Sequence, residues 1–480
     1  MAENRKSVPP ESTQQSLQDV IDLLHRQRLV EDLVHRQDMP KHDLVESLVH
    51  KQNIAALRKK LDQMHPADVA YILEALPLDE RLTVWDLVKA ERDGEILLEA
   101  SDAVRETLIA HMDSHELVAA AESLDTDEIA DLAPDLPRDV IQDVLEAMDE
   151  QNRAHLQSAL SFPEDTVGAL MDFEMVTIRA DIAVEVALRY LRRVGDLPDQ
   201  TDKIFVVDRD DILIGVVPLK HFLINNPDTM VSAIMVDNPV ILHPREDAGE
   251  AANAFERYNL VSAPVVDDNN KLIGRVTIDA VVDFIREESD NTVLGMAGLR
   301  EEEDLFSTVW KSVQNRGPWL AINLVTAFIA SRVIGMFEHS ISVIVALAAL
   351  MPIVAGIGGN SGNQTATLIV RALALGQIRT TSVRKLIAKE AGVGLLNGAI
   401  WGSAVGVFAY VLYQSASLAI VISVAMLLNL LIAALAGIVI PLSMHKLGRD
   451  PALGSTVLVT ATTDSMGFFI FLGLATVFLI

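Results

Sequence analysis

The chain has 480 residues, half of them hydrophobic, and a formal net charge of −28. Residues 317–480 hold eight Lys/Arg and four Asp/Glu, so residues 1–316 hold 31 basic and 63 acidic residues, a net charge of −32. A surface this acidic repels nucleic acid and attracts cations, and the lack of cysteine excludes disulfides and thiolate metal sites.

Residues 1–54 form a polar, amphipathic extension. Its first residues, MAENRKSVPPESTQQ, lack the apolar core of a signal peptide, so we expect later apolar segments to direct membrane insertion. The stretch LVEDLVHRQ (29–37) recurs as LVESLVHKQ (44–52). A basic residue and a glutamine follow each of three histidines, which favours a surface or partner-binding helix over a metal site: His25, His35 and His50.

Residues 55–163 predict an acidic, all-α domain. Short apolar stretches follow Pro or Asp residues, which are typical N-caps, and this indicates short antiparallel helices wound into a small superhelix. Asp127 and Asp131 are four residues apart and therefore share a helix face. Such like charges repel unless a cation or a partner surface lies between them, and a solvated surface is the alternative.

Residues 164–289 contain a duplication. ALMD (169–172), IFVVD (204–208) and IGVV (214–217) recur as AIMV (233–236), APVVD (263–267) and IGRV (273–276). Each copy predicts a strand, a helix, two strands joined by an Asp/Asn turn, and a final helix, an α+β pattern. This pattern resembles a tandem pair of CBS domains, with boundaries at 164–227 and 228–289.

The CBS resemblance also implies a nucleotide site. In that family a hydroxyl and an acid at the end of a copy bind the ribose and phosphate of an adenosine nucleotide. Thr277 and Asp279 of the second copy match those positions, whereas Pro218 replaces the hydroxyl in the first copy. We therefore expect at most one half of such a site, with ATP as its candidate ligand.

Residues 290–316 are expected to link the acidic part to the apolar part. An amphipathic helix is predicted over 292–316, leading directly into the first apolar stretch. Such a helix would connect the two parts mechanically.

Residues 317–480 predict a transmembrane domain of five helices. Each apolar stretch is long enough to cross a hydrocarbon core of about 30 Å. Basic residues gather before the first stretch, between the second and third, and between the fourth and fifth. Because basic loops stay in the cytoplasm, the N-terminus is expected inside and the C-terminus outside. The stretches are approximately 318–337, 341–370, 387–413, 417–444 and 454–480.

The second stretch contains an unusual run, PIVAGIGGNSGNQTAT (352–367). Its proline and four glycines either form a packing surface for a neighbouring helix or belong to backbone that lines a water-filled cavity. Helix packing needs no amides, so Asn360, Asn363 and Gln364 favour a pore.

Asp464 lies within the last stretch, in TATTDS (460–465). An acid inside a bilayer is costly and indicates an ion or proton pathway; a structural partnership with Arg332 is the alternative. One carboxylate among neutral hydroxyl and amide oxygens suits Mg²⁺ or Ca²⁺ rather than a soft metal. Glu390, at the start of the third stretch, is either a pore-mouth charge or an interfacial anchor.

Taken together, residues 55–480 resemble the MgtE-type magnesium channels. The resemblance rests on the order of the domains and on four motifs: PIVAGIGGNSGNQTATLIVRALALG (352–376), LFSTVWKSVQNRGPWLAINLVTAFIAS (305–331), RDPALGS (449–455) and TATTDSMGF (460–468). It implies a homodimer in the lipid bilayer of a bacterial inner membrane, with a pore along the dimer axis.

The resemblance also implies the pore residues. Asp464 matches the carboxylate that binds a hydrated Mg²⁺, and Gly356, Asn363 and Thr367 match second-span residues near the ion. The amide of Asn360 is a further candidate of our own.

In this family, cytosolic Mg²⁺ bridges acidic groups and closes the pore, so it acts as substrate and regulator. Ser289-Asp290-Asn291 departs from the family's Ala-Thr-Glu-Asp, which weakens the match beside it. Our candidates for the regulatory acids are Asp127, Asp131, Asp247, Glu250, Asp283, Glu287 and Glu288.

The sequence thus predicts a Mg²⁺-selective channel for magnesium uptake that cytosolic Mg²⁺ closes. Transport of Co²⁺, Mn²⁺ or Ca²⁺ is one alternative, and a non-conducting membrane Mg²⁺ sensor is another. An enzyme is not expected, because the sequence shows neither a nucleophile–base pair nor a phosphate-binding Gly-Lys-Ser/Thr motif.

Overall fold

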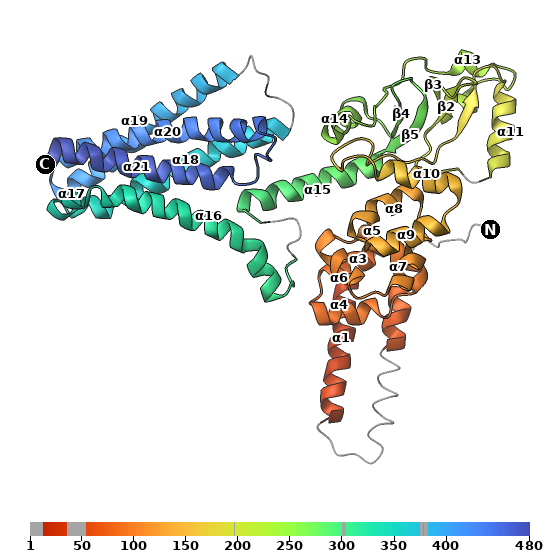
Figure 1. Cartoon of the computed structure of the whole chain (residues 1–480), viewed down its shortest axis with the longest axis horizontal. Coiled ribbons are helices and arrows are strands. Elements are labelled where there is room, and N and C mark those ends of the chain that lie inside the picture. Colours follow the sequence, from red (N-terminus) through yellow and green to blue (C-terminus); the bar gives the residue numbers. More distant parts are fainter. Residues whose placement is uncertain (1–12, 36–53, 196, 300–303, 375–377, 379–382) are drawn as a thin grey trace. The chain divides into compact units, whose positions relative to one another are not determined.

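The computed structural model describes residues 13–35, 54–195, 197–299, 304–374, 378 and 383–480 (Figure 1). The chain divides into two compact units. Unit 1 comprises residues 1–283 together with 304–307, and unit 2 comprises 284–303 together with 308–480.

The helical domain of unit 1 is built from short helices around one apolar core. After α1 (Thr13–His35) and a helical stretch over 54–61 come α3 (Pro66–Glu74), α4 (Leu78–Trp85), η1 (Ala90–Arg92), α5 (Asp93–Glu99), α6 (Asp102–Ile109), α7 (Ser114–Ala121), α8 (Thr126–Leu132), η2 (Ala133–Asp135), α9 (Arg138–Ala147) and α10 (Glu150–Ala159).

These helices begin where the sequence predicts. Pro77 and Pro137 are the N-caps of α4 and α9. Asp125 forms a capping box with Glu128 at the start of α8, in which each side chain bonds the other residue's backbone N–H. From α6 to α10 the helices begin at residues 102, 114, 126, 138 and 150, and this succession of short helices confirms the predicted all-α domain.

The N-terminal extension is not separate from this domain. Val20 and Leu24 of α1 are buried in the same core as Leu57 and Leu61, and Lys60 Nζ lies 2.8 Å from the Asp19 carboxylate. His25 is exposed. The second copy of the repeat, 44–52, and the side chains of the first lie outside the described residues.

The CBS pair of unit 1 has the predicted α+β character. The first copy contains β1 (Thr177–Arg179), α11 (Val184–Val194), β2 (Lys203–Val207), β3 (Leu213–Pro218) and α12 (Leu219–Ile224). The second contains α13 (Val231–Ile234), α14 (Ala248–Tyr258), β4 (Ser262–Val266), β5 (Leu272–Thr277) and the start of α15 (Ile278–Ala297).

The strands pair in the same way in both copies, with one difference. β2 is antiparallel to β3, and β4 is antiparallel to β5. β1 adds a parallel strand beside β2, whereas the corresponding strand of the second copy is reduced to one parallel bridge between Leu242 and Val265.

The segment that precedes the first strand position of each copy, its leading segment, pairs with the last strand of the other copy. Asp172 of the first copy bridges to Arg275 on β5, and Val236 of the second bridges to Val216 on β3. A glycine allows each approach: a methyl group on Gly215 would lie 2.7 Å from the Val236 carbonyl oxygen, and one on Gly274 would lie 2.4 Å from Met171 Cγ. The shared packing confirms the tandem CBS fold.

The predicted helix over 292–316 is wrong. α15 starts directly after β5 and ends at Ala297. Gly298 then takes a left-handed conformation, with φ +76°, which ends the helix. Residues 309–316 instead form the first two turns of α16 (Val309–Gly335), so Pro318 lies inside that helix.

Unit 2 is otherwise a bundle of long helices, coloured from green-teal to blue in Figure 1: α16, α18 (Ala346–Ala374), α19 (Val383–Tyr413), α20 (Ala416–Lys446) and α21 (Ser455–Leu479). Among the described residues, α16, α19, α20 and α21 are long and apolar enough to cross a membrane. α18 has the length, but its glycines and amides lower its hydropathy, so a fifth span remains a prediction.

The second of the predicted apolar stretches covers residues 341–370. It divides into the short α17 (Glu338–Val343) and α18, with a break at residues 344–345. Pro352 and the glycines lie inside the continuous helix α18 rather than at a break.

Candidate functional site

α18 presents its small and polar residues on two different faces. Gly356, Asn360 and Thr367 are exposed and Asn363 is half-buried. At spacings of four, three and four residues, these four positions line one side of the helix. The structure therefore brings together all four second-span residues predicted for the ion pathway.

The opposite face of α18 packs against α20 and α21. Gly358 and Gly362 are buried, and a methyl group on Gly362 would lie 2.5 Å from Val459 Cγ1 of α21. On α20, one on Gly437 would lie 2.6 Å from the Gly362 carbonyl oxygen. These glycines therefore form a helix-packing surface. The amides lie on the opposite face of α18, which does not take part in this packing.

Asp464 lies on α21 beside this amide face. Thr460 is one turn earlier on the same side of α21, and its hydroxyl accepts a hydrogen bond from Asn363 Nδ2 at 3.3 Å. The Asn363 Oδ1 atom is buried and has no hydrogen-bond partner within the described structure. Among the described residues no ion pair joins Asp464 to Arg332, whose side chain is exposed.

Glu390 is buried inside the helix bundle. It is only 5% exposed, and it accepts a hydrogen bond from the Thr365 hydroxyl of α18 at 3.3 Å. The Lys389 ammonium lies 2.7 Å from its other oxygen. The carboxylate is thus held against the same helix that carries the amide face.

Asn429 of α20 was not singled out from the sequence. It is fully buried, and its Nδ2 donates a hydrogen bond to the Val354 carbonyl of α18 at 3.0 Å. The signal was available, because Asn429 is the only amide between residues 415 and 446, in an otherwise apolar stretch.

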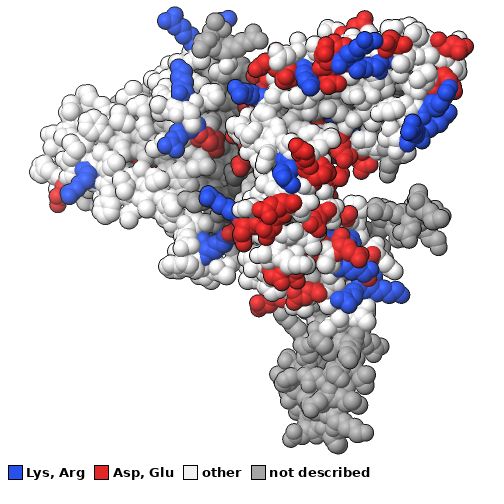
Figure 2. All heavy atoms as spheres, turned by 45° about the vertical axis from the view of Figure 1, so that its right-hand side comes forward, with Lys and Arg blue, Asp and Glu red and all other residues white. Residues whose placement is uncertain are grey.

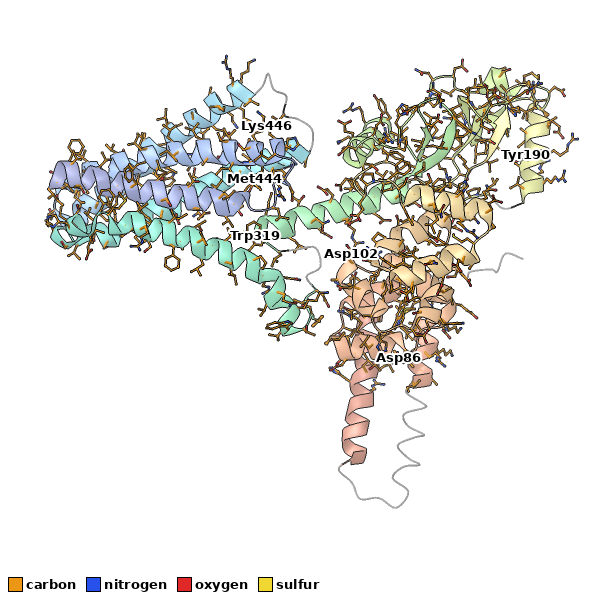
Figure 3. All side chains as sticks on the ribbon, viewed as in Figure 1. Asp86, Asp102, Tyr190, Trp319, Met444 and Lys446 are labelled. Atoms are coloured by element: carbon orange, nitrogen blue, oxygen red, sulfur yellow. The ribbon has the colours of Figure 1, made fainter. Side chains whose placement is uncertain are left out.

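The end of α15 is joined to the start of the helix that carries Asp464. The Thr456 hydroxyl in the first turn of α21 donates to the Met296 carbonyl at 3.0 Å. Trp319 of α16, labelled in Figure 3, packs against Gly298 after α15 and Gly454 before α21. Both glycines have positive φ, so their backbones pass close to the indole ring.

Acidic side chains are dense on unit 1, as the red surface in Figure 2 shows. Asp127 at the start of α8 is the most perturbed of them. Burial raises its pKa from 3.8 to about 7, and the carboxylates of Asp172, Asp131 and Glu128 add to the rise. Negative charge is crowded at this point, so a cation would stabilise it.

The other predicted regulatory acids are spread over the chain. Asp131 lies on α8, Asp247 caps α14 by accepting from the Glu250 amide at 3.0 Å, and Glu287 and Glu288 are exposed on α15. Asp283 belongs to unit 1. Within the part of the chain that the structure describes, no three or more His, Asp or Glu side chains are grouped so as to hold a metal ion.

The two candidate nucleotide residues lie at the junction of β5 and α15. Thr277 is buried at the end of β5, opposite Ser262 of β4, and Asp279 is exposed in the first turn of α15. Ser262 is also linked to the first copy, since its hydroxyl donates to Asp202 at 2.6 Å and its carbonyl accepts from Lys203 Nζ.

A buried ion pair holds the chain just before α16. Arg81 of α4 is fully buried and donates to the Asp304 carboxylate at 2.8 Å. The same guanidinium donates to the carbonyls of Leu73 and Leu76. Residues 304–307 are therefore part of unit 1, although their neighbours on both sides belong to unit 2.

Three family models match the chain. A divalent cation transporter model covers residues 351–474, the MgtE intracellular N domain covers 64–165, and the CBS domain covers 167–225 and 231–287. The order of these domains follows the units described above.

Relatives match over most of the chain. The magnesium transporter MgtE of Thermus thermophilus is 30% identical, covering 88% of this chain and 94% of its own length. That of Bacillus subtilis is 25% identical, covering 89% and 94%. A crystal structure of the cytosolic domain of the Mg²⁺ channel MgtE with ATP has a TM-score of 0.45 at 28% identity, and it covers 50% of this chain and 98% of its own. The chain belongs to the MgtE family of magnesium transporters.

Proposed function

We propose that this protein is a Mg²⁺ channel that mediates magnesium uptake and is closed by cytosolic Mg²⁺. The observation that carries the proposal is the pairing of Asp464 on α21 with the amide face of α18, linked through the hydrogen bond from Asn363 to Thr460. Relatives over nearly the whole length are magnesium transporters, and the chain follows them through the membrane unit.

The oxygen atoms of this face suit a hydrated ion. Mg²⁺ gives up its water reluctantly and keeps several waters when it binds protein. The unpartnered Asn363 Oδ1 and the exposed amide of Asn360 can accept hydrogen bonds from those waters. Asp464 supplies the negative charge that the α18 face lacks, and Gly356 and Thr367 extend that face by one turn each way.

Replacing Asp464 tests the pathway. In cells that lack other Mg²⁺ transporters, Asp464→Asn should lower Mg²⁺ uptake at least ~100-fold, because the charge that attracts the ion is lost. Glu338→Gln, which removes an exposed acid of α17, is the matched control and should retain uptake. Uptake by Asp464→Asn at the wild-type rate, with equal protein in the membrane, would place the pathway elsewhere.

The ion itself needs a separate measurement. Oxygen donors also suit Ca²⁺ and Mn²⁺, so selectivity for Mg²⁺ is part of the proposal. Competition by Co²⁺, Mn²⁺ and Ca²⁺ for Mg²⁺ uptake measures it. A non-conducting sensor would show no flux of any of these ions.

The proposal includes topology and assembly. Basic residues lie before α16, between α18 and α19, and between α20 and α21. They favour a cytoplasmic N-terminus and an external C-terminus, provided that α18 also crosses the membrane as the second of five spans. A homodimer in the bilayer would bring two amide faces to one pore. Reporter fusions at each end and the mass of the purified protein in detergent check these two points.

Closure is proposed to act through the acids of the cytosolic part and α15. Mg²⁺ held by acids such as Glu287 and Glu288 would fix α15, and the contacts from Met296 and Trp319 lead from its end to α21. Glu287→Gln with Glu288→Gln should therefore keep the channel open at millimolar Mg²⁺. Uptake measured against internal Mg²⁺ concentration gives the answer, and closure at the wild-type concentration would exclude these two acids as regulators.

A further inference from the structure

Asn429 is a polar residue buried in the apolar interior of the membrane unit, which suggests a specific role for its amide. An amide in the apolar interior costs free energy unless both of its ends are hydrogen-bonded. Only Nδ2 has a partner, the Val354 carbonyl, and Oδ1 has none in the described part of the bundle. A leucine would fill the position without that penalty.

Two glycines on different helices make room for this one side chain. A methyl group on Gly358 of α18 would lie 2.2 Å from Asn429 Nδ2, and one on Gly467 of α21 would lie 2.7 Å from the same atom. The amide is therefore held between the backbones of α18 and α21. At this level of the bundle, its size limits how closely these two helices approach.

The two helices that it separates are the two that carry the proposed ion pathway. On α21, Gly467 is one turn after Asp464. On α18, Gly358 lies between Gly356 and Asn360 in the sequence, on the opposite side of the helix. A change in the amide would therefore alter the distance between the carboxylate and the amide face without touching either.

We propose that Asn429 is a positioning residue for ion selectivity: its amide fixes the spacing of α18 and α21, and with it the width available to a hydrated divalent cation beside Asp464. This proposal rests on the proposed channel function. Ca²⁺ is larger than Mg²⁺ and loses its water readily, so a pathway of altered width would discriminate less between the two ions.

Asn429→Leu removes the hydrogen bond to Val354 and changes the shape of the side chain between α18 and α21. The Mg²⁺/Ca²⁺ uptake ratio should fall about fivefold, the change that corresponds to one lost hydrogen bond. Asn429→Ala leaves the glycines free to close the gap and should also lower the ratio. Asn429→Asp keeps the shape but has no N–H to donate to the Val354 carbonyl, so it should also lower the ratio.

Ser423→Ala is the matched control. Ser423 is a second polar residue on α20, but its hydroxyl donates to its own helix at Ala419 and packs against Gly406 of α19, away from α18 and α21. It should lower stability slightly and leave the ion ratio unchanged. A role limited to folding would make Asn429 variants resemble this control.

The outcomes separate the two levels of inference. If the wild type transports no divalent cation, the channel function fails. If the wild type transports Mg²⁺ and folded Asn429→Leu and Asn429→Ala keep its Mg²⁺/Ca²⁺ ratio, the positioning role is overturned. Should Asn429→Leu fail to assemble, as judged by size-exclusion chromatography, the ratio in Asn429→Ala and Asn429→Asp decides.

Discussion

The two CBS copies use opposite chemistry at the same position of their shared packing. Where the second leading segment meets β3, the contact is apolar, Val236 with Val216. Where the first leading segment meets β5, it is ionic: Arg275 is 4% exposed and donates to Asp172 through Nε at 2.7 Å. Arg275 also donates to the Asp199 carbonyl at 2.8 Å.

The difference follows from what surrounds each contact. The ionic contact faces the acids of α8, since the Asp172 carboxylate raises the pKa of Asp127. Burial likewise raises the pKa of Asp172 itself, and Arg275 opposes that rise. A cation fixed by the protein is thus placed beside the most crowded carboxylates of unit 1.

Breaking the ionic contact should have the largest effect. Arg275→Met leaves Asp172 buried without its partner, which typically costs about 3–5 kcal/mol. Thermal unfolding of the purified protein would measure it. The double variant Asp172→Val, Arg275→Val copies the apolar contact of the first copy and should recover most of that loss. A double variant as unstable as Arg275→Met would mean that the ion pair itself stabilises the junction.

A second difference between the copies concerns the nucleotide. We expect ATP to bind only where Thr277 offers a hydroxyl, and not where Pro218 replaces it. Thr277→Val should weaken ATP about tenfold, the loss of one hydrogen bond to a charged or polar group. Calorimetry on the full-length protein measures this, with Thr166→Val, at a half-buried threonine, as the control. Two sites per chain, or unchanged affinity in Thr277→Val, would contradict the comparison.

The smallest effect is a pH dependence of stability at α8. Because the folded pKa of Asp127, about 7, lies above its ordinary 3.8, the folded state holds the extra proton between these values. The stability that this proton provides is therefore present at low pH and lost as pH rises towards 7. In Mg²⁺-free buffer, Asp127→Asn should raise the melting temperature at pH 8 by a few degrees, at about 2–4 °C per kcal/mol.

The control for this measurement is Asp143→Asn, which neutralises an exposed acid of α9. It should change the melting temperature little between pH 5 and pH 8. Asp93, whose pKa burial raises to about 6, gives the wild type further dependence in the same range, so the difference between the two variants is the relevant quantity.

Local signals predicted much of the fold. The helix expected after the first strand of the second CBS copy is α14 at Ala248–Tyr258, because an Asp cap marks its start and apolar periodicity marks its buried face. The break in the predicted linker helix was missed because residues 292–316 keep a helical pattern in the sequence. In the structure Gly298 has a positive φ, which ends the helix. A helical pattern in the sequence reports only the local propensity of these residues to form a helix. The break at Gly298 also depends on its packing against Trp319, which the pattern does not contain.

The site was predictable only in part. Spacing along one helix places Gly356, Asn360, Asn363 and Thr367 together, so sequence alone groups them. No such rule connects Arg275 to Asp172, 103 residues away, or Asn429 to Val354, 75 residues away. These contacts form between elements, and one sequence carries no record of which elements meet.

The ion pair of Arg81 with Asp304 has a consequence for the connectivity of the protein. The chain passes between the two units three times, after residues 283, 303 and 307. A protease cut between Gly298 and Asp304 would leave residues 284–297 of the first fragment in unit 2 and residues 304–307 of the second in unit 1. Each fragment would hold a piece of the other's unit, so a nicked protein should purify as one particle.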